Sequence, residues 1–310
     1  MKTIVQKNKY RILLKTLLIL QIFLFWDIQV KDSTAAQKPT ASYYKRIISM
    51  SPGVTETLFA LGLGDKVVGI TRYCTYPPET EEITKVGGFY DPSYETIVSL
   101  KPDLVILLTS HKTIEKNLKK LGLKILIVKN NKIEDILDSI TTIGNFCGAE
   151  KKASEMLKNI RKRIRVIKSI TSDLPKPKVM LSVDRNAGTQ LFSEVYVAGK
   201  NIFYDKLITL AGGKNICNTR NIRYPVLSGE GIIRLNPDVI IDIVPDYKEK
   251  GLEIKNIIDE WNRFPSVEAV KNKRVYVFGD HYTAIPGPRF ILTLEALAKT
   301  IHPEVQWKQQ

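Results

Sequence analysis

The chain has 310 residues and a hydrophobic fraction of 44%, which is enough for two globular domains with sizeable cores. Its formal net charge of +15 raises the question of a nucleic-acid or membrane partner. The lysines are scattered and no dense basic arm with interleaved aromatic residues occurs, so we expect no nucleic-acid binding.

Residues 1–36 predict an export signal. A basic stretch ends at Arg11, the apolar core LLILQIFLFW covers residues 17–26, and small residues at 33–36 offer a cleavage site. This core is too short to span a bilayer, which requires about 20 residues. No cysteine lies near the cleavage region, so we expect no lipidation of a mature N-terminal cysteine. The expected protein is exported and periplasmic, or anchored to the membrane if the signal is not cleaved.

Residues 45–146 alternate between short apolar runs and helical patterns. The β-branched runs predict strands at 46–50, 66–70, 104–108 and 124–128. Apolar residues at helical spacing predict helices at 54–63, 94–100, 114–121 and 133–146. Such alternation is typical of a mostly parallel sheet with helices on its faces, which we expect to form an N-terminal lobe.

Residues 149–170, AEKKASEMLKNIRKRIRVIKSI, predict one long helix without proline or glycine. Apolar residues recur at spacings of three and four, at Met156, Leu157, Ile160, Ile164 and Ile167. The opposite face is rich in Lys and Arg. A basic amphipathic membrane helix is one interpretation. A solvated helix that packs on the domain through one apolar stripe is the other, and we favour it.

The strand–helix pattern returns in residues 178–305. Strands are expected at 178–183, 239–244 and 274–278, and helices at 201–211, 231–235 and 289–301. This region therefore predicts a second α/β lobe. The expected fold is two α/β lobes with mostly parallel sheets, joined by the single long helix, with a ligand cleft between the lobes.

One phrase occurs in both lobes. ETIVSLKPDLVI at residues 95–106 and EGIIRLNPDVII at 230–241 share six of twelve positions. Similar helix–turn–strand units explain the shared Leu, Pro, Asp and apolar run. They do not explain why Glu95 and Glu230 occupy the same position, at the start of a short helix where the helix dipole favours an acid.

The loops expected at the cleft are rich in aromatic residues, which suit a large, flat, partly apolar ligand. They carry Tyr73, Tyr76, Phe89, Tyr90, Tyr224 and Tyr282. His111 and His281 each follow a predicted strand, which directs them towards the expected cleft, and they are weak candidates to ligate a metal or a metal-centred macrocycle. No HExxH motif, Walker loop or GxSxG elbow occurs.

The sequence contains three cysteines, Cys74, Cys147 and Cys217. An oxidising compartment permits one disulfide among them and leaves one thiol over. Their spacing fits no zinc pattern. A disulfide and three isolated, partly buried thiols are equally consistent with the sequence, so we leave both open.

Several stretches together carry a family resemblance: RIISMSPGVTETLFALGLGDKVVGI, TRYCTYPPE, KVGGFYDPSYETIVSLKPDLVI, LAGGKNI and PGPR. They resemble the periplasmic binding proteins of ABC importers for cobalamin and, more broadly, for iron-siderophores and haem. The similarity runs from about residue 46 to about residue 303. It implies two α/β lobes bridged by one long helix, with little movement on ligand binding.

The resemblance also implies a docking role for the repeated acid. In this family each lobe presents a surface Glu to Arg residues of the membrane permease, and the matching positions are Glu95 and Glu230. The expected partners are thus an ABC importer permease dimer and a small-molecule ligand, with the binding protein itself a monomer.

The resemblance further implies aromatic contacts to a corrin ring at Tyr73, Phe89 and Tyr224, and Tyr90 lies in the same loop as Phe89. Cobalamin-binding members can have Trp where this chain has Phe89 and Tyr224. Siderophore binders often use Arg and Lys against catecholates, and Arg72, Arg185 and Arg223 could serve here.

The ligand expected from the sequence is a corrinoid such as cobalamin, with haem or a ferric siderophore as alternatives. We expect neither a cofactor of its own nor enzymatic activity. A competing hypothesis is an exported enzyme that holds a metal-centred cofactor on His111 or His281. A membrane-anchored sensor is a third, and it requires an uncleaved leader.

Overall fold

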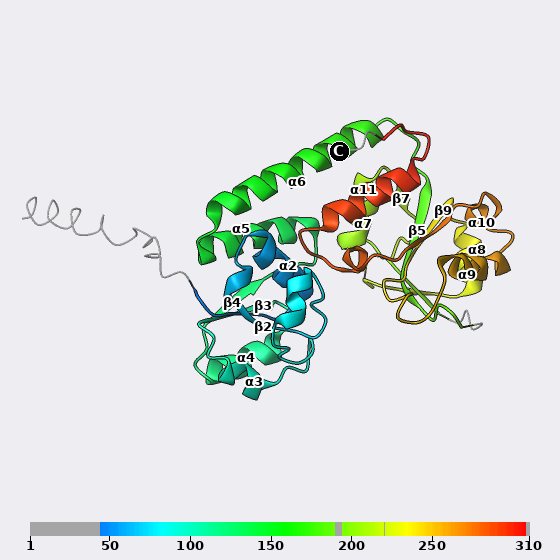
Figure 1. Ribbon diagram of the computed structural model, residues 1–310. Coiled ribbons are helices and arrows are strands. Elements are labelled where there is room, and N and C mark those ends of the chain that lie inside the picture. The colour runs from blue at the N-terminus through cyan, green and yellow to red at the C-terminus, as the bar shows by residue number, and fades with distance from the viewer. Residues whose placement is uncertain (1–43, 190–193, 220, 308–310) are drawn as a thin grey trace, which may run out of the picture. The chain divides into compact units, whose positions relative to one another are not determined.

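Each half of the chain folds its short apolar strands into a small, largely parallel β-sheet covered by helices (Figure 1). The computed structural model describes residues 44–189, 194–219 and 221–307. The predicted export signal at 1–36 lies outside the described residues. None of the described helices combines the length and apolarity needed to cross a membrane.

The N-terminal sheet has four parallel strands in the order β2-β1-β3-β4. They are β1 (Ile47–Ser49), β2 (Val67–Ile70), β3 (Leu104–Leu108) and β4 (Ile125–Val128). β3 is buried along its whole length, as a central strand covered on both faces must be. The helices around it are α2 (Pro52–Ala60), α3 (Tyr94–Ser99), α4 (Lys112–Lys120) and α5 (Ile133–Cys147), with 3₁₀ turns η1 (Gly64–Lys66) and η2 (Pro78–Glu82).

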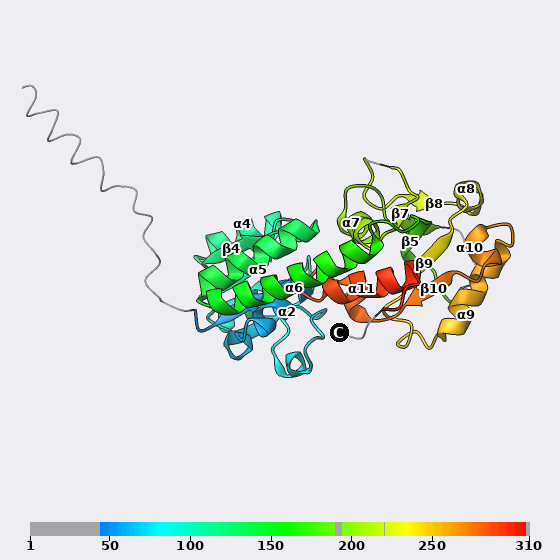
Figure 2. The same cartoon turned by 90° about the horizontal axis from the view of Figure 1, so that it is seen from above.

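One long helix, α6 (Glu150–Thr171), leads from this sheet to the next. It buries a single stripe formed by Ala153, Leu157, Ile160, Ile167 and Thr171. Figure 2 shows α6 lying outermost, alongside α5 and α11. The interpretation as a solvated helix packed through one stripe agrees with this burial, because the apolar side that a membrane helix would need is inside the protein.

The C-terminal sheet has the strand order β10-β9-β5-β6-β8, with β7 paired to β5. Its strands are β5 (Lys178–Arg185), β6 (Val195–Val197), β7 (Lys214–Asn215), β8 (Val226–Leu227), β9 (Val239–Ile243) and β10 (Val275–Phe278). β6 and β8 are antiparallel additions at one edge, and the other pairings are parallel. The helices are α7 (Phe203–Leu210), α8 (Gly229–Leu235), α9 (Ile254–Asp259), α10 (Glu268–Lys271) and α11 (Phe290–Ile301), with 3₁₀ turns η3 (Glu260–Arg263) and η4 (His281–Ala284).

The two sheets repeat one topology. β2-β1-β3-β4 corresponds to β7-β5-β9-β10, since in each lobe the first strand pairs in parallel with the strand that follows the shared phrase. Ile47 lies beside Leu104 in one sheet, and Val179 lies beside Val239 in the other. The internal repeat seen in the sequence is therefore a repeat of architecture.

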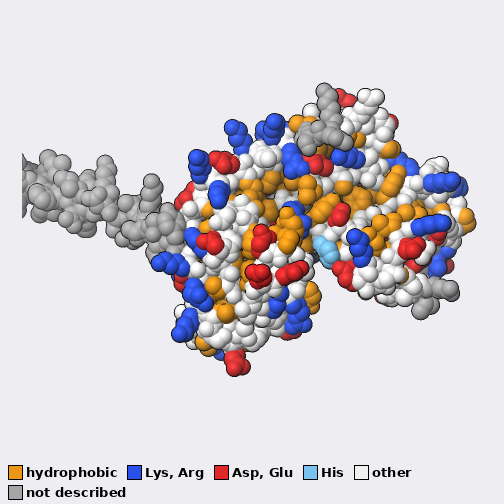
Figure 3. Space-filling view, in the orientation of Figure 1, with side chains coloured by type: hydrophobic (Ala, Val, Ile, Leu, Met, Phe, Trp, Pro, Cys, Tyr) orange, Lys and Arg blue, Asp and Glu red, His pale blue; other side chains and the backbone are white. Residues whose placement is uncertain are grey.

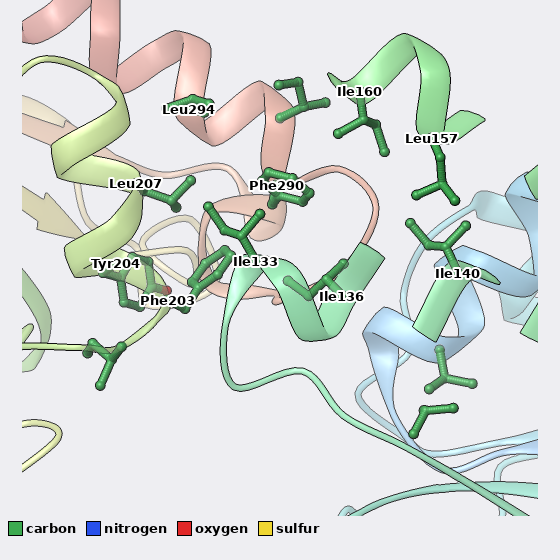
Figure 4. Close-up of a cluster of buried hydrophobic side chains, with 14 of the residues drawn as sticks. Ile133, Ile136, Ile140, Leu157, Ile160, Phe203, Tyr204, Leu207, Phe290 and Leu294 are labelled. Carbon is green, nitrogen blue, oxygen red and sulfur yellow. The ribbon is translucent and has the colours of Figure 1, made fainter. Parts of the chain in front are cut away.

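One of the four hydrophobic clusters among the described residues contains residues of both lobes. Ile133 and Ile136 of α5 belong to the same buried cluster as Phe203 of α7 and Phe290 of α11. Figure 4 shows these side chains pointing toward one another from three helices. Because the residues of both lobes are removed from water together, separating the lobes would expose core surface.

A buried ion pair adds to this contact between the lobes. Arg289, at the start of α11, donates two hydrogen bonds to Glu56 of α2, at 3.0 and 2.6 Å. The chain comes close enough here to require glycine, because a Cβ on Gly53 would lie 2.4 Å from the carbonyl oxygen of Pro286. This approach accounts for the glycines of the SPG and PGPR stretches, and we call the Glu56–Arg289 pair the interlobe latch.

Candidate functional site

The repeated phrase forms the same helix start in both lobes. Ser93 and Ser228 are the N-cap residues of α3 and α8, and each Oγ accepts a hydrogen bond from a backbone N–H three residues on, at 3.2 Å. Glu95 and Glu230 follow two residues after these caps, in the first helical turn. Both are exposed, and neither carboxylate has a hydrogen-bond or ion-pair partner within the described residues.

The rest of the phrase has a structural explanation. Lys101 and Asn236, six residues after each Glu, both adopt a left-handed backbone with φ of 46°. The next aspartates then bind the start of the neighbouring strand: Asp103 accepts from the N–H of Arg46 at 3.0 Å, and Asp238 from that of Lys178 at 2.7 Å. The two aspartates therefore fasten the turn to the neighbouring strand, whereas the two glutamates make no such contact.

An aromatic cluster lies at the carboxyl end of the N-terminal sheet. The ring of Phe89 is 4.7 Å from that of Tyr90 and 4.4 Å from the imidazole of His111, in edge-to-face arrangements. Phe89 is half-buried and Tyr90 is exposed. The loop thus presents one half-buried ring and one exposed ring that pack against each other, and exposed aromatic surface of this kind suits contact with a flat ligand.

His111 is buried and packs against both rings of this aromatic cluster. It is 1% exposed, and its Nδ1 accepts a hydrogen bond from the N–H of Leu108 at 3.3 Å. Burial lowers the pKa of His111 to about 4. Its Nε2 has no hydrogen-bond partner among the described residues, and the imidazole packs edge-to-face against both rings. In this arrangement His111 presents no exposed ring nitrogen that could ligate a metal.

The C-terminal lobe contributes the loop before β8. Arg223 in this loop donates a hydrogen bond to Asn131 of the N-terminal lobe, at 3.1 Å. Tyr224 is partly exposed, and burial raises the pKa of its phenol. The phenol also lies near Tyr204, whose hydroxyl donates to the carbonyl of Thr283. The loop that carries Tyr224 therefore faces the other lobe.

Tyr73 is largely exposed, and the guanidinium of Arg72 lies 5.9 Å from its ring centre. Tyr76 lies elsewhere, because the Arg289 guanidinium of the interlobe latch covers its ring at 3.6 Å. A cavity of about 540 Å³ opens beside it, between α2, η2, α6 and α11. Figure 3 shows hydrophobic side chains gathered in a band over this face. None of the predicted ligand contacts lines that cavity.

Arg185 differs from the expectation that it contacts a ligand. Its side chain is 3% exposed, and Nε donates to Asp242 at 2.7 Å. The same guanidinium pairs with Glu260, whose other oxygen accepts from the N–H of Gly188. Satisfied by two carboxylates inside the lobe, Arg185 holds the loop after β5 and is not available to the cleft.

The side chain of His281 is 51% exposed, and its Nε2 lies 3.3 Å from a carboxylate oxygen of Glu249. In the part of the chain that the structure describes, no group of three or more His, Cys, Asp or Glu side chains could hold a metal ion. The three cysteines are buried and unpaired with one another. Of the two alternatives left open by the sequence, the structure thus has isolated thiols.

The sequence did not point to the interlobe latch or to Asn131. The PGPR stretch was a usable signal for the latch, because a glycine–proline loop just before a helix positions Arg289 at the helix start. Its acidic partner lies 233 residues away, so only the fold reveals it.

Comparisons with known proteins agree with this architecture. The family model of the periplasmic binding proteins matches residues 47–282. An uncharacterized ABC transporter substrate-binding lipoprotein of Bacillus subtilis (strain 168) is 33% identical over 287 residues, covering 90% of this chain and 85% of that protein. A vitamin B12-binding protein of Vibrio parahaemolyticus is 26% identical over 281 residues, covering 89% of this chain and 94% of that protein.

Among solved structures, the periplasmic heme-binding protein of Roseiflexus sp. RS-1 in apo form is similar, with a TM-score of 0.71 and 26% identity. The match covers 84% of this chain and 98% of that one. The two lobes, the long connecting helix and these matches over most of the chain lead to one conclusion: the chain belongs to the periplasmic binding protein family.

Proposed function

We propose that this protein is an extracytoplasmic solute-binding protein that captures a corrinoid between its lobes and delivers it, without chemical turnover, to the permease of an ABC importer. The observation that carries the delivery role is the pair Glu95 and Glu230. Each is an exposed acid at the same position of the same helix–turn–strand unit, and neither carboxylate has a hydrogen-bond or ion-pair partner among the described residues.

A pair of this kind suits a partner with two similar subunits. A permease dimer offers each lobe an equivalent surface, and arginine on that surface would bind a carboxylate through charge-assisted hydrogen bonds. Two such contacts would fix orientation as well as register. The Bacillus subtilis relative, which is named as an ABC transporter substrate-binding lipoprotein, supports the same kind of partner.

Transport assays test the docking role. We expect Glu95→Gln with Glu230→Gln to abolish ligand uptake through the permease while the affinity for free ligand stays within about twofold, because neither residue lies in the aromatic loops. Glu81→Gln with Glu155→Gln, two exposed acids outside the repeat, is the matched control and should transport normally. Normal uptake by the Glu95 and Glu230 double variant would refute the docking role.

The ligand is proposed from the aromatic loops. Tyr73, Phe89 and Tyr90 extend from the N-terminal lobe and Tyr224 from the C-terminal lobe, so rings from both sides could flank one large planar molecule. The vitamin B12-binding relative supports a corrinoid. Haem is the second candidate, because the heme-binding structure is similar in fold, with a TM-score of 0.71.

Calorimetry distinguishes the ligands. Cyanocobalamin, haemin and a ferric siderophore are titrated separately into the purified protein. We expect one-to-one binding of cyanocobalamin at submicromolar affinity. Binding of haemin or the siderophore, with none of cyanocobalamin, would exclude the corrinoid and leave the delivery role intact.

Two tyrosine variants of similar exposure test the proposed ligand site. Tyr224→Ala should weaken corrinoid binding by about tenfold or more, because a stacked aromatic ring contributes about 1 kcal/mol beyond its buried area. Tyr196→Ala is the control, since Tyr196 has nearly the same exposure, 37% against 36%, but lies on β6. Equal losses in the two variants would contradict the proposed site.

A further inference from the structure

The outer face of α6 carries a row of basic side chains that the solute-binding role does not use. We call it the basic stripe, and it consists of Lys151, Lys158, Arg161, Lys162, Arg165 and Lys168. At about 100° per residue these positions fall within an arc of about 120°, and they extend over about 25 Å of helix. Figure 3 shows Lys and Arg side chains along the upper edge of the view, where Figure 1 places α6.

None of the six cations forms an ion pair within the described residues, although Glu155 lies one helical turn from Lys151 and Lys158. All six side chains are exposed, and none has a hydrogen-bond or ion-pair partner among the residues that the structure describes. Arg163 on the same helix behaves differently, because it lies outside the arc and donates two hydrogen bonds to Glu295, at 2.6 Å each. Pairing is thus available on α6 and is absent along the stripe.

A groove runs beside the stripe, between α5 and α6. It has a volume of about 730 Å³. Three of the six cations line it: Lys158, Arg161 and Arg165. Thr141, Asn145 and Ser154 add groups that can hydrogen-bond, and Glu150 is the single acid in the lining. The groove therefore combines an excess of positive charge with hydrogen-bond donors.

Uncompensated charges at this spacing create a field outside the protein. Neighbours such as Lys158 and Lys162 are about 6 Å apart along the helix, less than the Debye length of about 8 Å at physiological ionic strength. Their potentials therefore add, and the repulsion among them is relieved when an anion binds.

We propose that the α5–α6 groove and the basic stripe bind a linear polymer of phosphate groups. A linear anion can place successive charges along the helix while part of it enters the groove. A flat membrane cannot enter a groove, and the apolar side of α6 that would insert into lipid is buried in the core. The same row of charges thus favours a flexible polyanion over a bilayer.

Such binding would leave the Glu95 side of the delivery surface open. α3, which carries Glu95, lies on the far side of the N-terminal lobe from α6 in Figure 1. A polyanion of the cell envelope could therefore hold the protein by its α6 side while Glu95 stays free. This inference does not depend on the identity of the ligand in the cleft.

Inorganic polyphosphate is the probe, and binding is measured by calorimetry at several salt concentrations. We expect the wild-type protein to bind, with an affinity that falls steeply as salt rises. Lys158→Gln, Arg161→Gln and Arg165→Gln together should weaken binding by more than tenfold and reduce the salt slope by about two to three. Glutamine has good helix propensity, and an unchanged thermal midpoint will confirm that the triple variant is folded.

The matched control removes the same charge from α4, as Lys112→Gln, Lys116→Gln and Lys120→Gln, and should bind polyphosphate within about twofold of wild type. Equal weakening in both triple variants would overturn the proposal, because net charge alone would then explain binding. Tighter binding to phosphatidylglycerol vesicles or to single-stranded DNA than to polyphosphate would also overturn it, as would no binding at all.

Discussion

His111 allows the strongest quantitative test of the structure. Its imidazole is buried under Phe89 and Tyr90, and burial lowers its pKa from 6.5 to about 4. The His111→Asn variant removes the titrating ring. Asparagine places an oxygen close to where Nδ1 stood, so the hydrogen bond from the N–H of Leu108 can be kept.

The sign of the effect follows from proton linkage. A histidine with a lowered pKa binds fewer protons in the folded state than in the unfolded chain between the two pKa values. Its contribution to stability is therefore complete above pH 6.5 and is lost as the pH falls toward 4. With these two pKa values the loss is about 2 kcal/mol at pH 5 and about 3 kcal/mol at pH 4.

Urea unfolding at pH 7, 5 and 4 measures this difference. The free energy of unfolding of wild type should fall more steeply with acid than that of His111→Asn, by about 3 kcal/mol between pH 7 and pH 4. Comparing the two proteins cancels the titration of the carboxylates they share. His281→Asn, which removes an exposed histidine, should keep the steep wild-type loss. Parallel curves for wild type and His111→Asn would refute the buried, neutral imidazole.

Three further predictions follow from contacts in the fold. Arg289→Met should lower the free energy of unfolding by about 3–5 kcal/mol because it leaves the Glu56 carboxylate buried without its partner, and adding Glu56→Leu should restore most of the loss in a double-mutant cycle. Asp103→Ala should cost about 2 kcal/mol by urea unfolding, because two backbone N–H groups lose their acceptor; a cost no larger than that of an exposed Asp→Ala change would contradict this. A thiol reagent should label the native protein slowly and the urea-unfolded protein completely, since all three thiols are buried, and fast native labelling would contradict the burial of Cys74, Cys147 and Cys217.

The regular elements were predictable because their signals are local. Strands such as β3 and β9 are continuous apolar runs, and helices such as α5 and α6 have long helical periodicity, so their bounds agree with expectation to within about two residues. β6 and β8 were missed because they have only three and two residues, and their pairing depends on a distant partner. α10, with four residues, is too short to show periodicity.

In the candidate site, too, features with local signals were predictable and contacts with distant residues were not. The positions of Glu95 and Glu230 follow from a local rule about helix starts, and the structure has both at helix starts. The contacts of Arg185 could not be predicted from the sequence. An arginine at a strand end is expected to face the cleft, but the carboxylate that binds it lies 57 residues away. The roles of the predicted ligand contacts stay predictions, to be tested by the titrations above.

The core shared by the two lobes has a consequence for signalling. Phe203, Phe290 and the α5 isoleucines join the two halves in one buried cluster, so separating the lobes would expose this apolar surface to water. If the lobes stay together, occupancy of the cleft is not signalled by a change of shape, because a ligand shifts only equilibria between states that it binds differently. Empty and loaded molecules would compete for the same permease on nearly equal terms. The ratio of their concentrations, more than their conformations, would set how often a docking event delivers cargo.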